Sequence, residues 1–122
     1  MFTSAAGSLL LSAQSIPSAY IELGSVSYLA IEEMVSVYRA SSMLHATVSA
    51  TVNVPESIAG SAYTLTVRSD SMIAVTGNLN RTFTLPNLAS AVWEYSSFQS
   101  GGLLLHVDAE YQSGSLLISI SS

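Results

Sequence analysis

The spacing of the apolar residues changes at residue 44, and this change constrains the fold more than any other feature of the sequence. From residue 19 to 43 they recur about every 3.6 residues, the period of an α-helix, in two adjoining rows. From residue 44 to 54 they alternate with polar residues, as in a strand with one buried face. The sequence therefore predicts one long helix followed directly by β-structure.

The predicted helix carries a wide apolar surface. One row contains Ile21, Tyr28, Ile31, Val35 and Tyr38, and the adjoining row contains Leu23, Val26, Ala30, Met34 and Val37. At about 100° per residue the two rows cover more than half of the helix circumference. We expect partners on two sides, and we assign Ile21, Tyr28, Ile31 and Val35 to contacts with the core or with neighbouring copies.

The remainder of the chain predicts an antiparallel β head. About six or seven strands are expected in the segments 44–54, 63–67, 72–76, 79–85, 92–95, 103–111 and 115–121. Residues 96–102 are interpreted as a loop, and the last two strands as a hairpin. Because the helix precedes all the strands, the fold class is α+β: one long N-terminal helix packed on an antiparallel sheet or small sandwich. Residues 1–122 form a single domain, with 1–18 as a flexible lead-in ended by Pro17, 19–43 as the helix and 44–122 as the head.

The composition excludes several classes of partner. The chain has three arginines, no lysine and a net charge of −5, so it cannot neutralise a nucleic-acid backbone. Cysteine is absent, which excludes disulfides and thiolate metal sites. Only 9% of the residues are charged, while 24 serines and 8 threonines supply an uncharged polar surface. No apolar stretch of the sequence reaches the roughly 20 residues of a membrane span.

The residues that could carry chemistry favour structural roles. His106, Asp108 and Glu110 alternate along one strand, nearly 7 Å apart by the strand rise of roughly 3.4 Å, which suits a solvated face better than a metal site. Glu32 and Glu33 diverge by about 100° on the helix, and His45 falls on the polar side of its predicted strand. No serine is framed as a nucleophile. We expect no catalytic residue, no metal, no cofactor and no enzymatic activity.

Two segments are candidates for surface contacts or modification. Asn80-Arg81-Thr82 matches the acceptor pattern for N-linked glycan at Asn80, whose side chain is expected on the polar face of its strand. Trp93, Tyr95 and Phe98 could form an aromatic contact patch, although a core or loop-closing cluster is the better interpretation. An exposed Trp93 would favour the patch.

Two stretches resemble the archaeal type IV pilin-like proteins. The first is the helix that runs into the valine-alternating segment 46–54, followed by Pro55, Gly60 and the strand that opens at Tyr63. The second is Ser100-Gly101-Gly102 before the closing hairpin. Together they cover most of residues 25–120. The resemblance implies a secreted subunit whose signal peptide and membrane helix lie upstream of residue 1.

The resemblance also implies a function. We expect a structural subunit of a cell-surface filament, with copies of itself or other pilin-like subunits as partners, and with membrane anchoring before assembly only through that upstream segment. Two alternatives stay open: an extracellular binding module for glycans or surface proteins, and a viral structural subunit.

Overall fold

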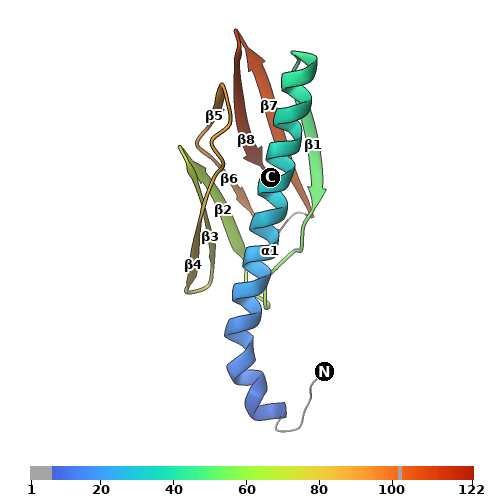
Figure 1. Ribbon diagram of the computed structural model, residues 1–122. Coiled ribbons are helices and arrows are strands. Elements are labelled where there is room, and N and C mark those ends of the chain that lie inside the picture. Colours follow the sequence, from blue (N-terminus) through green and yellow to red (C-terminus); the bar gives the residue numbers. More distant parts are fainter. Residues whose placement is uncertain (1–6, 102) are drawn as a thin grey trace.

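The computed structural model describes residues 7–101 and 103–122, with side chains from residue 18 onward. One helix, α1 (Gly7–Leu44), precedes eight strands (Figure 1). The strands are β1 (Val48–Asn53), β2 (Tyr63–Arg68), β3 (Ser71–Thr76), β4 (Leu79–Thr84), β5 (Ala91–Trp93), β6 (Ser96–Gln99), β7 (Leu104–Gln112) and β8 (Ser115–Ser121).

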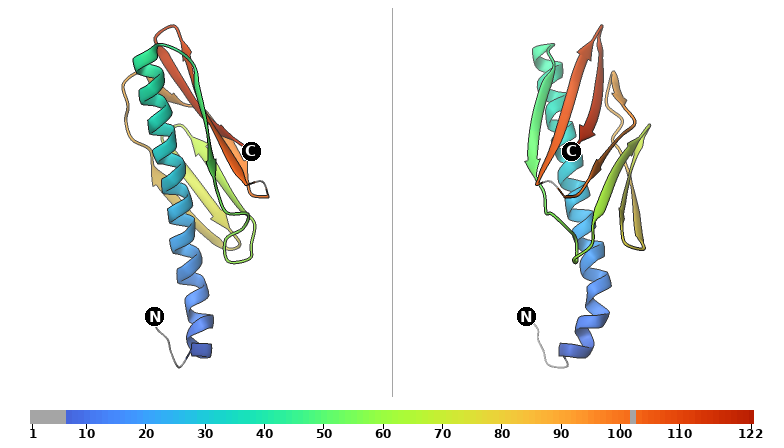
Figure 2. Two further views of the ribbon diagram at one scale, coloured as in Figure 1. Left: turned by 90° about the vertical axis from the view of Figure 1, so that its right-hand side faces the viewer. Right: turned by 180° about the vertical axis from the view of Figure 1, so that it is seen from behind.

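The strands form two sheets of four strands beside the helix. One sheet has the order β1-β7-β8-β5 and the other β4-β3-β2-β6. All pairs are antiparallel except β5 with β8. In the views of Figure 2, α1 runs along both sheets and its first turns extend beyond them. The α+β class and the packing of one long N-terminal helix on antiparallel-rich sheets are confirmed.

The helix begins earlier than the sequence indicated. It starts at Gly7 and runs through Pro17, so the predicted start at residue 19 is wrong, whereas residues 1–6 of the expected lead-in lie outside the described residues. A proline inside a helix removes one main-chain hydrogen bond. The leucines and alanines before it favour helix, and this local preference outweighs the proline.

The junction between helix and head also differs from the prediction. The helix ends at Leu44, and His45 adopts a left-handed backbone conformation with φ of 51°. The first strand therefore starts at Val48 rather than at residue 44, and the placement of His45 on a strand is wrong. The ring of His45 instead meets Tyr111 edge-on, with 5.5 Å between the ring centroids.

One strand was missed. Residues 96–99, interpreted as part of a loop, form β6 and pair with β2, with Phe98 opposite Leu65. The segment contains a single large apolar residue among serines and glutamine, which is too little alternation for a recognisable strand pattern. The remaining strands overlap the predicted segments, including the hairpin of β7 and β8, although β5 ends at Trp93 rather than at residue 95.

The core lies between α1 and the two sheets. The helix contributes the row Leu23, Val26, Ala30, Met34 and Val37, all at most 5% exposed. Tyr63 of β2 is 1% exposed, and its hydroxyl donates a hydrogen bond to the carbonyl oxygen of Pro55 at 2.5 Å. Burial raises the pKa of Tyr63 to about 12, because ionisation would place a charge where water cannot reach it.

Candidate assembly surface on the helix

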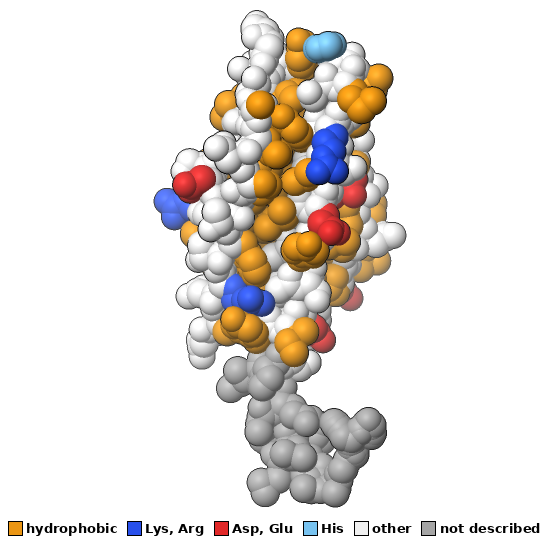
Figure 3. Space-filling model, in the orientation of Figure 1, with side chains coloured by type: hydrophobic (Ala, Val, Ile, Leu, Met, Phe, Trp, Pro, Cys, Tyr) orange, Lys and Arg blue, Asp and Glu red, His pale blue; other side chains and the backbone are white. Residues whose placement is uncertain are grey.

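The second apolar row of α1 lies largely outside the core, although Ile31 and Tyr38 pack against its edge. Ile21 and Tyr28 are 65% and 63% exposed, while Ile31 and Val35 are half-buried. The adjoining row already fills the space between the helix and the sheets, so these four side chains project along its flank. We call Ile21, Tyr28, Ile31 and Val35 the helix stripe. Figure 3 shows apolar side chains gathered along the front of α1.

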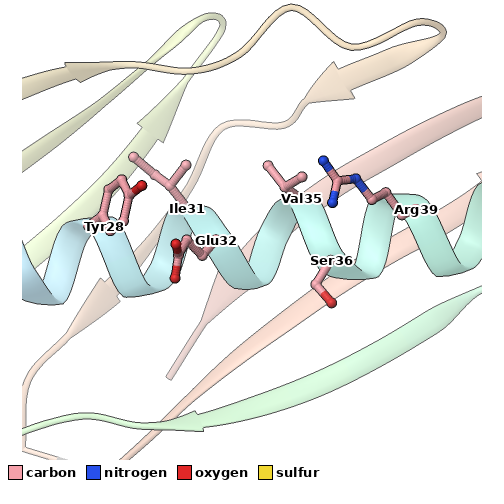
Figure 4. A pocket seen from close by; sticks show the side chains of 6 residues that line it. All are labelled: Tyr28, Ile31, Glu32, Val35, Ser36 and Arg39. Atoms are coloured by element: carbon pink, nitrogen blue, oxygen red, sulfur yellow. The ribbon is translucent and has the colours of Figure 1, made fainter.

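The helix stripe borders two adjoining hollows that share Tyr28. The first has a volume of about 430 Å³ and the second about 400 Å³. The first is lined by Tyr28, Ile31, Glu32, Val35, Ser36 and Arg39, whose arrangement Figure 4 shows. The second is lined by Tyr20, Ile21, Gly24, Ser25 and Tyr28 from the helix and by Arg81 and Phe83 from β4. The surface is therefore a shallow apolar groove with one carboxylate and two guanidinium groups beside it.

Arg81 ties β4 to the helix at one end of this groove. Its guanidinium carbon lies 3.8 Å from the ring centroid of Tyr20 and 4.8 Å from that of Phe83. Its Nη1 donates a hydrogen bond to the carbonyl oxygen of Tyr20 at 3.0 Å. A Cβ atom on Gly24 would collide with that Nη1, so the glycine is what lets the guanidinium lie against the helix.

A third hollow lies near the C-terminal end of the helix. It has a volume of about 300 Å³ and is lined by Tyr38, Ser42, His45, Ala89, Ser90, Tyr111, Gly114 and Leu116. The hydroxyl of Tyr38 donates a hydrogen bond to the carbonyl oxygen of Ala89 at 2.7 Å. This contact fixes the segment before β5 against the helix. We therefore interpret the hollow as part of the packing between that segment and the helix, rather than as a binding site.

The three aromatic residues Trp93, Tyr95 and Phe98 do not form an exposed contact patch. Trp93 is 8% exposed and Phe98 is fully buried, so both belong to the core, and only Tyr95 is at the surface, with 75% of its area exposed. The indole Nε1 of Trp93 donates a hydrogen bond to the carbonyl oxygen of Pro86 at 3.2 Å. The buried indole counts against a binding module that uses these three aromatic residues.

The polar residues of the head stand as the strand alternation predicts. Asn80 is exposed on β4, so the amide of the candidate glycan acceptor faces solvent. Asp108 accepts a hydrogen bond from the Ser49 hydroxyl at 2.5 Å, and Glu110 accepts one from the Gln112 amide at 2.7 Å. Within the described part of the chain, no group of three or more His, Asp and Glu side chains is placed to hold a metal ion.

Comparison with known proteins gives no relative. A scan against family models finds no match, and searches of curated proteins and of solved structures find no similar chain. Among the helical residues that the structure describes, no segment is both long enough and apolar enough to cross a bilayer.

Proposed function

We propose that this protein is a non-enzymatic structural subunit of a type IV pilus-like filament at an archaeal cell surface. In this proposal the helix makes the contacts between subunits, and the β head is displayed outward. The subunit is secreted, membrane-anchored before assembly through a segment upstream of residue 1, and joined to copies of itself or to other pilin-like subunits.

The helix stripe is the observation that carries the proposal. A helix that serves only its own head needs one buried face, and α1 buries the row from Leu23 to Val37 for that purpose. The helix nevertheless exposes a second set of large apolar side chains, with Ile21 and Tyr28 more than half exposed. Contiguous exposed apolar surface of this kind marks an interaction site.

The length of the helix supports the same function. Its 38 residues correspond to about 57 Å at a rise of about 1.5 Å per residue. Figure 1 shows the N-terminal turns beyond the ends of both sheets. A helix that is longer than the head it packs against can reach neighbouring subunits, as the contacts of a filament require.

The head has a surface that suits display. Charged residues are few, and the solvent-facing positions of β1 are Ser49, Thr51 and Asn53. Such a surface stays hydrated without attracting polyanions or polycations. The exposed Asn80 offers a place for a glycan on β4, in the other sheet.

The test is recovery of the chain from filaments. A tagged full-length protein is expressed in its native cells, surface filaments are sheared off, and mass spectrometry reads the chain and its N-terminus. The proposal expects a processed chain in the filament fraction. Recovery only of an unprocessed protein from the cell interior would overturn it.

Variants then test the role of the helix stripe. Ile21→Ser with Tyr28→Ser should remove the chain from filaments while leaving its cellular level and its circular dichroism unchanged. Leu29→Ser is the matched control, because Leu29 is 40% exposed on the other flank of the same helix. Equal incorporation of the stripe variant and the control would refute assembly through this surface.

A further inference from the structure

The helix stripe repeats with a period of seven residues. Ile21, Tyr28 and Val35 are spaced by seven, and Ile31 lies three residues after Tyr28. This is the a and d spacing with which two helices pack side by side along a seam. The groove is therefore suited to a second helix that lies along α1, rather than to a compact ligand.

Two opposite charges with the same spacing lie beside the stripe. Glu32 and Arg39 are both exposed, are seven residues apart and line the same hollow. Within one helix they are separated by about 10.5 Å along the axis, which is too far for a direct ion pair. The other carboxylates on α1, Glu22 and Glu33, do not line this hollow. The groove thus offers one acidic and one basic group to an incoming helix.

The arrangement of these charges favours an antiparallel pair of copies over a parallel pair in register. A second copy that packs in parallel and in register places Glu32 against Glu32 and Arg39 against Arg39, which is repulsive. A second copy that packs antiparallel, with a two-fold axis between Val35 and Ser36, places each Glu32 against the Arg39 of the other copy. The same axis brings Tyr28 level with Met43 of the second copy, a side chain that is 81% exposed.

We propose that two copies of this chain pair antiparallel through the helix stripe, with Glu32 of each copy bonded to Arg39 of the other. An interface that uses the same patch on both copies closes after two subunits. The pair is therefore distinct from a filament contact, which must stay open at both ends. It is a form of the free subunit in which Tyr28, Ile31 and Val35 of the stripe are covered, whereas Ile21 lies beyond the end of the second helix, and it does not depend on the filament proposal.

Charge reversal tests the pairing on the 122-residue chain in solution. Sedimentation equilibrium up to about 1 mM gives the dissociation constant of the pair. Glu32→Arg and Arg39→Glu each place like charges opposite one another at both ends, and each should raise this constant about tenfold or more. The double variant with both changes restores the two attractive pairs and should return the constant to near that of the unmodified chain. Glu22→Arg has the same change in net charge as Glu32→Arg, away from the hollow, and should have little effect.

Cysteine cross-linking tests the direction independently. The chain contains no cysteine, so single substitutions give an unambiguous product. Val35→Cys lies next to the proposed axis and should form a disulfide-linked dimer on oxidation. Ile21→Cys lies far from the axis and should not, although it is on the same stripe.

The outcomes separate the alternatives. A chain that is monomeric at all concentrations, or charge reversals that leave the dissociation constant unchanged, would overturn the proposal. Cross-linking through Ile21→Cys as efficient as that through Val35→Cys would show a parallel pair and would overturn it as well. Loss of pairing in both single reversals, with recovery in the double variant, is the supporting result.

Discussion

Gly24 and Arg81 form a pair whose energetic coupling can be calculated from the structure. A glycine inside a helix costs roughly 0.8–1.0 kcal/mol relative to alanine, so Gly24→Ala should by itself stabilise α1 by that amount. The added Cβ would collide with Nη1 of Arg81 and displace the guanidinium. Because that atom is the end of a flexible side chain, it can move away, and the cost is the contacts that it leaves.

Those contacts set the magnitude. The guanidinium lies 3.8 Å from the ring centroid of Tyr20, and such a contact contributes about 0.5–1 kcal/mol at an exposed site. The hydrogen bond from Nη1 to the carbonyl oxygen of Tyr20 contributes about 1 kcal/mol. Gly24→Ala should therefore lower the free energy of unfolding by about 0.5–1 kcal/mol in the unmodified chain. In an Arg81→Ala background the same change should raise it by about 1 kcal/mol.

The assay is a double-mutant cycle measured by urea unfolding. Circular dichroism follows the helix and the fluorescence of Trp93 follows the core, and coincident curves establish two-state unfolding. The expected coupling energy is about 1.5–2 kcal/mol. Ser36 lines the hollow that Arg81 does not touch, so Ser36→Ala should raise the free energy of unfolding by the same small amount in both backgrounds. If Gly24→Ala stabilises both backgrounds by about 1 kcal/mol, the guanidinium does not lie against Gly24 and the two residues are not coupled.

Three further predictions concern the core and its boundary. Burial raises the pKa of Tyr63 to about 12, so above about pH 10 the unfolded chain loses this proton while the folded chain keeps it. The free energy of unfolding should therefore fall between pH 10 and 12, by up to about 1.4 kcal/mol per pH unit. Tyr63→Phe should flatten that decline, and an unchanged slope in urea titrations would contradict the burial of the phenol. Met34→Ala should lower the free energy of unfolding by about 2–5 kcal/mol, and Val35→Ala should lower it clearly less, because Val35 is only half-buried. Equal losses in the same denaturation assay would mean that the two rows of the helix do not differ in burial. The fluorescence of Trp93, the single tryptophan, should be blue-shifted and poorly quenched by acrylamide, and strong quenching would revive the aromatic contact patch.

Periodicity predicted most of the fold because it reports burial directly. The two-residue alternation placed β2, β3, β4, β7 and β8. In β2, β3 and β8 the inward residues are buried, whereas β4 alternates between half-buried and exposed residues. The pair Gly77-Asn78 between two alternating segments is also a local turn signal, and in the structure Thr76 and Leu79 pair across it while Gly77 has a φ of 57°. These are local signals, and each is complete within a few residues.

Non-local pairing accounts for the errors in the fold. The segment with Phe98 becomes a strand because β2 offers it a free edge, which no pattern within residues 96–99 records. The parallel pairing of β5 with β8 likewise depends on residues more than twenty positions apart. Residues 44–47 alternate between apolar and polar types, as a strand would, but they are not part of one. The left-handed conformation of His45 ends the helix there, and the strand begins only at Val48.

The candidate site was only partly predictable for a related reason. Two apolar rows on the helix were visible in the sequence, but nothing in their composition told which row faces the sheets. The structure shows that the row with Ala30 packs on the sheets, whereas Tyr28 remains 63% exposed. The role of Gly24 was equally hidden, since the sequence shows a weak helix position and only the structure shows Arg81 opposite it.

The energetics of the helix stripe set a bound on what it can hold together. Covering a large apolar side chain yields about 1.5–3 kcal/mol when burial is complete, and Tyr28 and Met43 are the residues with most exposed surface that the pair would cover. Association of two proteins costs at least about 4 kcal/mol in lost motional freedom before any gain appears. The stripe, with two exposed ion pairs of up to about 1 kcal/mol each, therefore supports a weak, reversible pair. A filament that survives shearing from cells needs apolar contacts beyond the stripe. The proposed assembly therefore requires that the helix contact neighbouring subunits over more of its length than the part that packs on its own head.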